Sequence, residues 1–247
     1  MRIIYKSVAI TALILTWLLY STNASGATEV ANLTNIRIGD VTVKVTAPAG
    51  FVETSARSPQ LWQRAQSMTT GYSEVLANFV TSGDFVAFVK NDTPSFSEYY
   101  IVSTPKPAKH RTTNQKQFDE LRFGLAGMQS KLKQNMEPQL SNELSKLNSN
   151  LSTQAGKPLA IKIGQVVPVS VNINRQNLLS YTVLSQLSTS NENVISSDTM
   201  IMTTGVCFLK GKVLMLNYYS VFKSPQDLET SRKSIENWAE SLLMSNK

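Results

Sequence analysis

The feature that most constrains the fold is a hairpin in the last quarter of the chain. Residues Met200 to Leu209 and Lys212 to Phe222 are rich in apolar and aromatic residues, and they flank the turn Lys210-Gly211. A short turn between two such arms is typical of a β-hairpin. Because both arms are almost continuously apolar, they belong where neither side meets solvent. The sequence therefore predicts a hairpin in the middle of a sheet that is covered on both faces.

Further strand signals lie before this hairpin. Ile36 to Ile38 and Val41 to Val45 surround Gly39-Asp40, and the second arm alternates apolar and polar residues, so a first hairpin is predicted. The polar run Ser188 to Asp198 predicts an exposed loop. The other expected strands are 85–89, 99–103, 160–163, 166–173 and 178–187.

Three stretches have the apolar spacing of amphipathic helices. The first begins at Ser58-Pro59, an N-cap followed by proline, and its apolar stripe runs from Leu61 to Phe79. The second runs from Gln115 to Leu151, and Pro138 predicts a kink in it. The third is capped by Ser224-Pro225. This order predicts an α+β fold with a mainly antiparallel sheet flanked by helices and a long kinked amphipathic helix in the middle.

Two segments carry a more specific pattern. Residues 41–51 read VTVKVTAPAGF, a strand followed by a P-x-G-F turn. Near the other end, Gly211-Lys212 sits at a hairpin turn, Leu214 to Tyr219 forms a strand, and Trp238 lies in the last helix. In these segments the chain resembles the PsbP-like and DcrB-like exported proteins. The resemblance implies a PsbP-like sandwich and an envelope location, and it implies no activity because the motifs are structural.

The first 26 residues have the composition of a secretory signal peptide. Arg2 and Lys6 precede the apolar run Val8 to Tyr20, and a small polar stretch follows up to Gly26. The run is shorter than the roughly 20 residues that cross a bilayer. We therefore expect cleavage before Ala27, a single α+β domain over 27–247, and a periplasmic or secreted protein. Tethering to the membrane by an uncleaved signal is the alternative.

The chain has few of the residues that bind metals and cofactors or form disulfides. His110 is the only histidine and Cys207 the only cysteine, in different contexts, so no ordinary zinc or copper site is expected. A single cysteine also excludes an internal disulfide. Because Cys207 lies in an apolar run, we expect a buried hydrophobic residue, whereas His110 lies between two cations and is expected in an exposed loop. No cofactor is predicted.

Catalytic patterns are equally scarce. Ser103 and Lys106 have the S-x-x-K spacing of penicillin-recognising enzymes, but Pro105 and Pro107 favour extended backbone, which would place the two side chains poorly for contact. The loop acids Asp84, Asp92 and Glu98 are expected to be solvated, with a calcium site as the alternative reading. We predict no catalytic residue and no enzymatic activity.

The charge of the chain is uneven. It has 24 Lys and Arg against 17 Asp and Glu, and residues 101–175 alone hold eleven cations and four acids. A positive surface favours acidic protein partners, with anionic lipid as the alternative. No nucleic-acid partner is predicted, because aromatic residues do not alternate with the cations. The candidate surface consists of Lys106, Lys109, His110, Arg111, Lys116 and Arg122.

These features predict an exported, non-enzymatic envelope protein that binds a protein partner. An adaptor and an inhibitor or immunity protein against an exported toxin both fit the sequence. The alternative function is binding of a small molecule or lipid in a pocket between the sheet and the long helix. Phe118, Met128 and Met136 would line that pocket.

Overall fold

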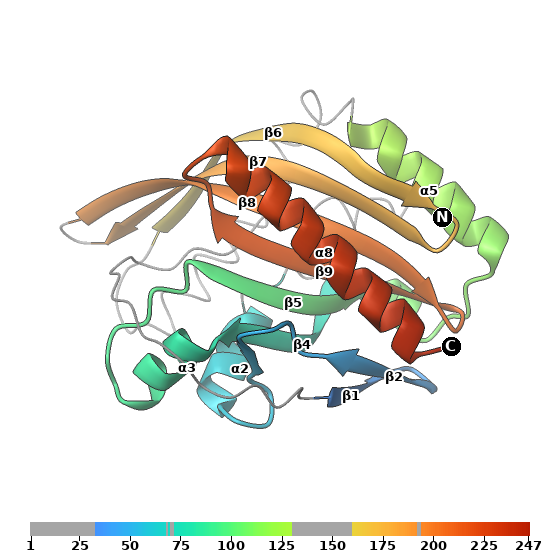
Figure 1. The fold of residues 1–247 in the computed structure, drawn as a ribbon, viewed down its shortest axis with the longest axis horizontal. Coiled ribbons are helices and arrows are strands. Elements are labelled where there is room, and N and C mark those ends of the chain that lie inside the picture. The colour runs from blue at the N-terminus through green and yellow to red at the C-terminus, as the bar shows by residue number, and fades with distance from the viewer. Residues whose placement is uncertain (1–32, 68, 70–71, 130–159, 192–193) are drawn as a thin grey trace.

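The described part of the chain is built around one large antiparallel sheet. The computed structural model describes residues 33–67, 69, 72–129, 160–191 and 194–247. Neighbouring strands of the large sheet follow the order β3-β4-β5-β9-β8-β7-β6, and β1 and β2 form a separate two-stranded sheet (Figure 1). The strands are β1 Leu33–Ile38, β2 Val41–Thr46, β3 Phe51–Glu53, β4 Ser73–Thr81, β5 Glu98–Pro105, β6 Ala160–Arg175, β7 Leu178–Asn191, β8 Val194–Leu209 and β9 Lys212–Val221.

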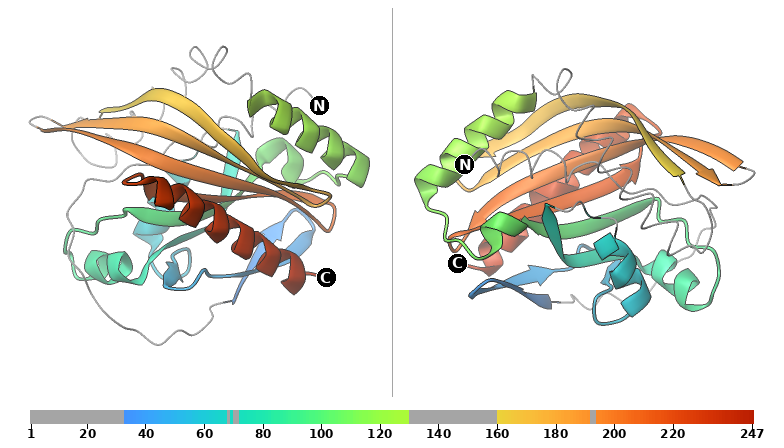
Figure 2. Two further views of the ribbon diagram at one scale, coloured as in Figure 1. Left: turned by 45° about the horizontal axis from the view of Figure 1, so that its top comes forward. Right: turned by 180° about the vertical axis from the view of Figure 1, so that it is seen from behind.

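Helices cover both faces of this sheet. They are α2 Pro59–Ser67, α3 Ser82–Val89, α4 Lys106–Lys109, α5 Gln115–Gln129 and α8 Pro225–Ser245. Helix α8 and the β1–β2 hairpin lie on one face, and α2 and α5 lie on the opposite face (Figure 2). The fold is therefore α+β with a mainly antiparallel sheet flanked by helices, as predicted.

The predicted central hairpin is confirmed, and it explains where the core lies. Strands β8 and β9 pair from Met200↔Val221 to Leu209↔Lys212 around the Lys210-Gly211 turn. Strand β9 is the middle strand of the large sheet, and eight of its residues in succession are buried. Alternate side chains of β9 enter two different cores, with Tyr219 on the α5 face and Tyr218 on the α8 face. Continuous burial follows because both faces are covered.

Helix α8 is fastened to the sheet by polar contacts as well as by its apolar stripe. Its first turn is closed by Asp227, whose Oδ2 accepts from the backbone N–H of Ser224 at 2.7 Å, which confirms the predicted cap. Trp238 donates its indole N–H to the carbonyl of Thr46 in β2 at 2.8 Å. The ring of Trp238 also packs edge-on against Phe79 of β4. The C-terminal helix therefore joins the small sheet to the large one.

Two predicted elements near the N-terminal half are wrong. The helix expected from Leu61 to Phe79 ends as α2 at Ser67, and residues 73–81 form β4. Ala77 and Phe79 lie two positions apart and enter the same core, as in a strand, and pairing with β3 and β5 selects the strand. The strand expected at 85–89 is instead α3, because Thr81 accepts from the N–H of Asp84 and caps a helix there.

Three smaller expectations also change. The polar run 188–198, predicted to be an exposed loop, mostly forms strand. Strands β7 and β8 pair within it as far as Asn191↔Val194. The two strands expected at 160–163 and 166–173 are one strand, β6, with a register shift between Ile163 and Val166. The stretch after Pro105, expected to be extended, forms the short helix α4.

Some predictions fall outside the described residues. Residues 115–129 form α5, as expected for the start of the long helix, and its continuation through Pro138 to Leu151 lies outside the described ranges. The predicted signal peptide 1–26 also lies outside them. None of the helices within the described ranges has the length and apolar character needed to cross a membrane.

Candidate functional site: a basic end of the sheet

The basic stretch Lys106 to Thr113, which holds four of the six residues of the predicted surface, meets two hairpin turns at one end of the sheet. The N–H of Thr113 donates to the carbonyl of Gly211 in the β8–β9 turn at 2.8 Å. On the other side, the β1–β2 turn comes so close that a Cβ on Gly39 would lie 2.6 Å from the carbonyl oxygen of Lys109. Gly39 has φ +61°, so both its backbone and its surroundings require glycine.

Lys212 holds this junction together from inside. Its side chain is 1% exposed, and its ammonium lies 2.8 Å from Oδ1 of Asp40 in the β1–β2 turn. The same nitrogen donates to the carbonyl oxygens of Lys109 at 3.5 Å and Arg111 at 3.3 Å. The hydrogen bond from Lys212 is the main reason that the pKa of Asp40 lies below its usual value. A buried cation thus ties two distant segments of the chain to the start of β9.

The junction gathers cations from three parts of the sequence. We call it the basic end, and define it as Arg37, Lys109, His110, Arg111, Lys210 and Lys212. Glu74 pairs with Lys109 at 2.7 Å, and Asp40 pairs with Lys212. Arg37, Arg111 and Lys210 are exposed, and no carboxylate of the described residues forms an ion pair with them. The basic end therefore presents net positive charge to solvent.

The six residues of the predicted surface do not all belong to this site. Lys109, His110 and Arg111 are part of it, and His110 is exposed as expected. Lys106 begins α4 and Lys116 lies in the first turn of α5, and both are exposed. Arg122 is different: it donates to Asn174 of β6 and to Asp119, and its guanidinium lies 4.5 Å from the centroid of the Phe123 ring. Arg122 therefore joins α5 to β6.

Sequence reasoning missed three members of the basic end: Arg37, Lys210 and Lys212. Each lies in or beside a hairpin turn that the sequence did predict. Nothing in the local pattern shows that the two turns meet, because the contact joins segments more than 100 residues apart. A lysine at the start of a buried strand was the one available signal, since buried lysines need partners.

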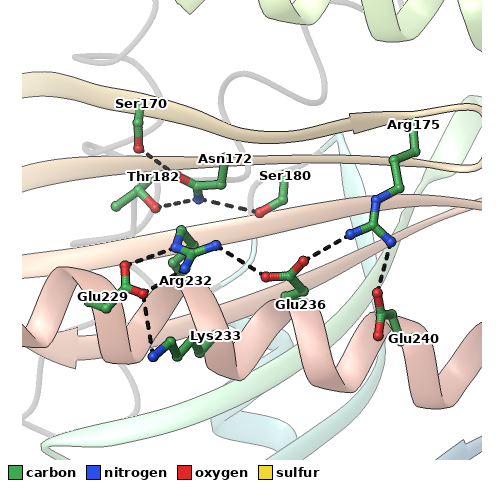
Figure 3. Close-up of polar contacts among 10 residues, drawn as sticks. All are labelled: Ser170, Asn172, Arg175, Ser180, Thr182, Glu229, Arg232, Lys233, Glu236 and Glu240. Carbon is green, nitrogen blue, oxygen red and sulfur yellow. Dashed lines mark hydrogen bonds and ion pairs between the residues drawn. The ribbon is translucent and has the colours of Figure 1, made fainter.

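A second polar region lies between α8 and the β6–β7 edge of the sheet (Figure 3). Asn172 donates to Thr182 at 2.8 Å, and Arg175 bridges Glu236 and Glu240 of α8 at 2.9 and 2.8 Å. In α8 itself, Arg232 pairs with Glu229 and Glu236. Because these side chains form hydrogen bonds and ion pairs with one another, they hold α8 against the sheet. We therefore do not take this region as a ligand site.

The structure also shows where the candidate catalytic and metal-binding residues lie. Ser103 is fully buried in β5, where its Oγ accepts from Asn217 at 3.3 Å, while Lys106 is exposed, so this pair is not an active site. Cys207 is fully buried, as predicted, and burial raises the pKa of its thiol to about 12. The described residues contain no cluster of three or more His, Cys, Asp or Glu that could hold a metal ion.

The structure corrects the expectation for Asp84 and places one of the three residues named for the alternative pocket. Asp84 is not a solvated loop acid: it is 6% exposed, and its Oδ1 accepts from the N–H groups of Ser95 and Phe96. Phe118, which would line a pocket under the alternative function, is fully buried and stacks on Phe208 with ring centroids 5.2 Å apart, so it belongs to the core. The side chains of Met128 and Met136 lie outside the described set.

Comparison with known proteins gives structural matches only. No protein-family model matches the chain, and no curated protein sequence is significantly similar to it. Among solved structures, the Ran-binding protein Mog1p of Saccharomyces cerevisiae is similar with 12% identity and a TM-score of 0.30, covering 88% of this chain and 93% of that one. A mutant of the protein Mog1 is similar with 11% identity and a TM-score of 0.30, covering 87% of this chain and 93% of that one.

Cyanobacterial PsbP (CyanoP) from Synechocystis sp. PCC 6803 is a third similar structure. It has 9% identity and a TM-score of 0.32, with coverage of 90% of this chain and 96% of that one. At such TM-scores, none of the three similarities carries an argument about function.

Proposed function

We propose that the chain is an exported, non-enzymatic domain that binds an acidic segment of a cell-envelope protein through its basic end. The observation that carries the proposal is the convergence of Arg37, Arg111 and Lys210 around the buried Lys212. These exposed cations come from separate segments that the fold holds in fixed relative positions. A rigid positive surface attracts carboxylate-rich partners and steers their approach. An adaptor role and an inhibitor role both use such a surface.

Binding can be tested by capture from envelope extract with residues 27–247 as bait. The test variant carries Arg111→Gln and Lys210→Gln, which remove two exposed charges of the basic end. The control carries Arg57→Gln and Lys90→Gln, which remove two exposed charges elsewhere. We expect a stoichiometric acidic protein with the parent and the control, captured less at higher salt, and at least tenfold less with the test variant.

Equal capture by the parent and the test variant, or capture that does not respond to salt, would contradict the proposed surface. The partner's identity then separates the two roles. A toxin as partner, together with sensitivity of deletion cells to neighbouring competitors, supports the inhibitor. An envelope-complex subunit, with an envelope defect in cells grown alone, supports the adaptor.

Export is the other half of the proposal, and the support for it is the pattern of residues 1–26. We expect the protein from the periplasm or medium to begin near Ala27, with an intact mass lower than that of the full chain by the mass of residues 1–26. Mass spectrometry of the separated membrane and soluble fractions measures this directly. A full-length species in membranes would show that the signal remains as an anchor.

A further inference from the structure

A small cavity lies at the end of the sheet opposite the basic end. It has a volume of about 250 Å³, and its lining comes from the start of β5, the end of β9 and the start of α8. Strand β9 begins at Lys212, in the basic end, and ends at Val221, which lines the cavity. This cavity is separate from the basic end that the proposed function uses.

The lining of the cavity is mainly polar and combines two carboxylates with hydroxyl groups, which can accept as well as donate hydrogen bonds. Glu98 provides a carboxylate, and Ser97, Ser220 and Thr230 provide hydroxyl groups. The hydroxyl of Tyr218 donates to Oε2 of Glu98 at 2.7 Å. Burial is the main cause of the raised pKa of Tyr218, and the charge of Glu98 adds to it, so the phenol keeps its proton and remains a donor to the carboxylate.

The two carboxylates of the cavity differ in what they already bind. Oδ2 of Asp227 accepts from the N–H groups of Lys223 and Ser224 at 2.8 and 2.7 Å, so its negative charge stabilises the N-terminus of α8. Glu98 accepts a hydrogen bond from the uncharged hydroxyl of Tyr218, and no cation among the described residues forms an ion pair with Glu98. Glu98 is therefore the negative charge that a ligand would neutralise.

The wall that carries Glu98 is held in place. Oδ1 of the buried Asp84 accepts from the N–H groups of Ser95 and Phe96 at 2.7 and 3.0 Å. Phe96 adopts φ +44°, a conformation that costs a non-glycine residue energy. The Asp84 contacts hold the chain in this conformation just before Ser97 and Glu98, so the cavity wall does not have to be ordered by a ligand.

From this geometry we propose that the cavity binds a small organic cation, a primary aliphatic ammonium, with its charged group on Glu98. An ammonium has three donors and no acceptor, which matches a lining of two carboxylates, of which Glu98 has no cation as partner, and several hydroxyl oxygens. The volume suits a compact ligand, since sites for drug-sized molecules start at about 300 Å³. Lys223 also lines the cavity and opposes a cation, so it moderates the affinity.

The test is isothermal titration calorimetry of residues 27–247 with n-butylamine hydrochloride, and with sodium butyrate as the ligand of opposite charge. We expect saturable binding of the amine alone. Glu98→Gln should weaken it at least tenfold, because the ionic hydrogen bond is lost. Lys223→Gln should strengthen it a few-fold, because a like charge is removed. Glu120→Gln, which removes an exposed carboxylate on α5, should leave it unchanged.

Three results would overturn the proposal: no saturable heat with butylamine, equal or tighter binding of butyrate, or unchanged affinity in Glu98→Gln. If Glu98→Gln fails to fold, Lys223→Gln decides the matter, because Lys223 is exposed and its replacement should not affect folding. Unchanged or weaker amine binding in that variant would contradict the assignment. Capture of a protein partner by the basic end is independent of each of these outcomes.

Discussion

Lys212 is the residue whose surroundings depend most on the complete fold. Its buried ammonium meets the carboxylate of Asp40 and two backbone carbonyls from the segment after β5. Replacement by an apolar side chain would leave those two carbonyls without a donor, while Asp40, which is 81% exposed, would return to water. The cost of the substitution therefore arises mainly from the carbonyl groups.

We predict that Lys212→Met lowers the free energy of unfolding by about 1–3 kcal/mol. Urea denaturation with an unchanged m-value measures this. Lys210→Met is the matched control, because it removes an exposed lysine two residues away and should change stability by at most about 0.5 kcal/mol. Equal midpoints for Lys212→Met and the parent would show that the ammonium does not hold the junction.

At the scale of elements, Asp84 connects α3 to the loop before β5. Its Oδ2 accepts from the hydroxyl of Thr81 at 2.7 Å, and its Oδ1 accepts from the N–H groups of Ser95 and Phe96. One buried carboxylate thus closes the start of the helix and fixes a loop eleven residues later. This loop leads directly into Glu98 and the cavity.

Asp84→Ala should lower the free energy of unfolding by about 2–4 kcal/mol, because it removes several charge-assisted hydrogen bonds and leaves buried N–H groups unpaired. Asp92→Ala, which removes an exposed acid of the same loop, should change stability by at most about 0.5 kcal/mol. Thermal and urea unfolding of both variants give the comparison. Similar losses in the two variants would mean that the charge of the loop matters and the buried contacts do not.

For the whole molecule, the arrangement of carboxylates predicts how stability depends on pH. Hydrogen bonding to Lys212 lowers the pKa of Asp40, and hydrogen bonding to Arg232 lowers the pKa of Glu229 to about 2. Such groups stay ionised in the folded protein at a pH where the unfolded chain already binds protons. Their stabilising contribution is complete above the ordinary carboxyl pKa and is lost as pH falls through the lowered value.

The urea midpoint should therefore fall as the pH is lowered from about 4.5 to about 2. Glu229→Gln should remove part of this dependence, and Glu120→Gln serves as the control carboxylate. Unfolding curves at closely spaced pH values, at low and at high salt, measure the effect, which salt should reduce because these groups are exposed. A midpoint that rises or stays level on acidification would contradict the assignment.

The residues of β4 show why part of the fold could not be predicted. Leu61 to Phe79 has apolar residues at helical spacing, yet Ala77 and Phe79, two positions apart, equally fit a strand. Only pairing with β5, from Ser73↔Pro105 to Val80↔Tyr99, decides between them. The strand predicted at 85–89 is wrong for a local reason, because the neighbouring residues Thr81 and Asp84 form a capping pair that starts a helix there.

The sequence alone determined the features that depend on neighbouring residues: the two hairpins with Gly39 and Gly211 in their turns, the cap of α8 at Ser224, and the burial of Cys207. Turn chemistry, capping and runs of apolar residues act over a few positions, so they can be read directly. Only the tertiary structure decided that Lys212 and Arg37 join the basic stretch and that Glu98 meets the start of α8. Those contacts join segments far apart in the chain, and strand order, not local pattern, sets which segments meet.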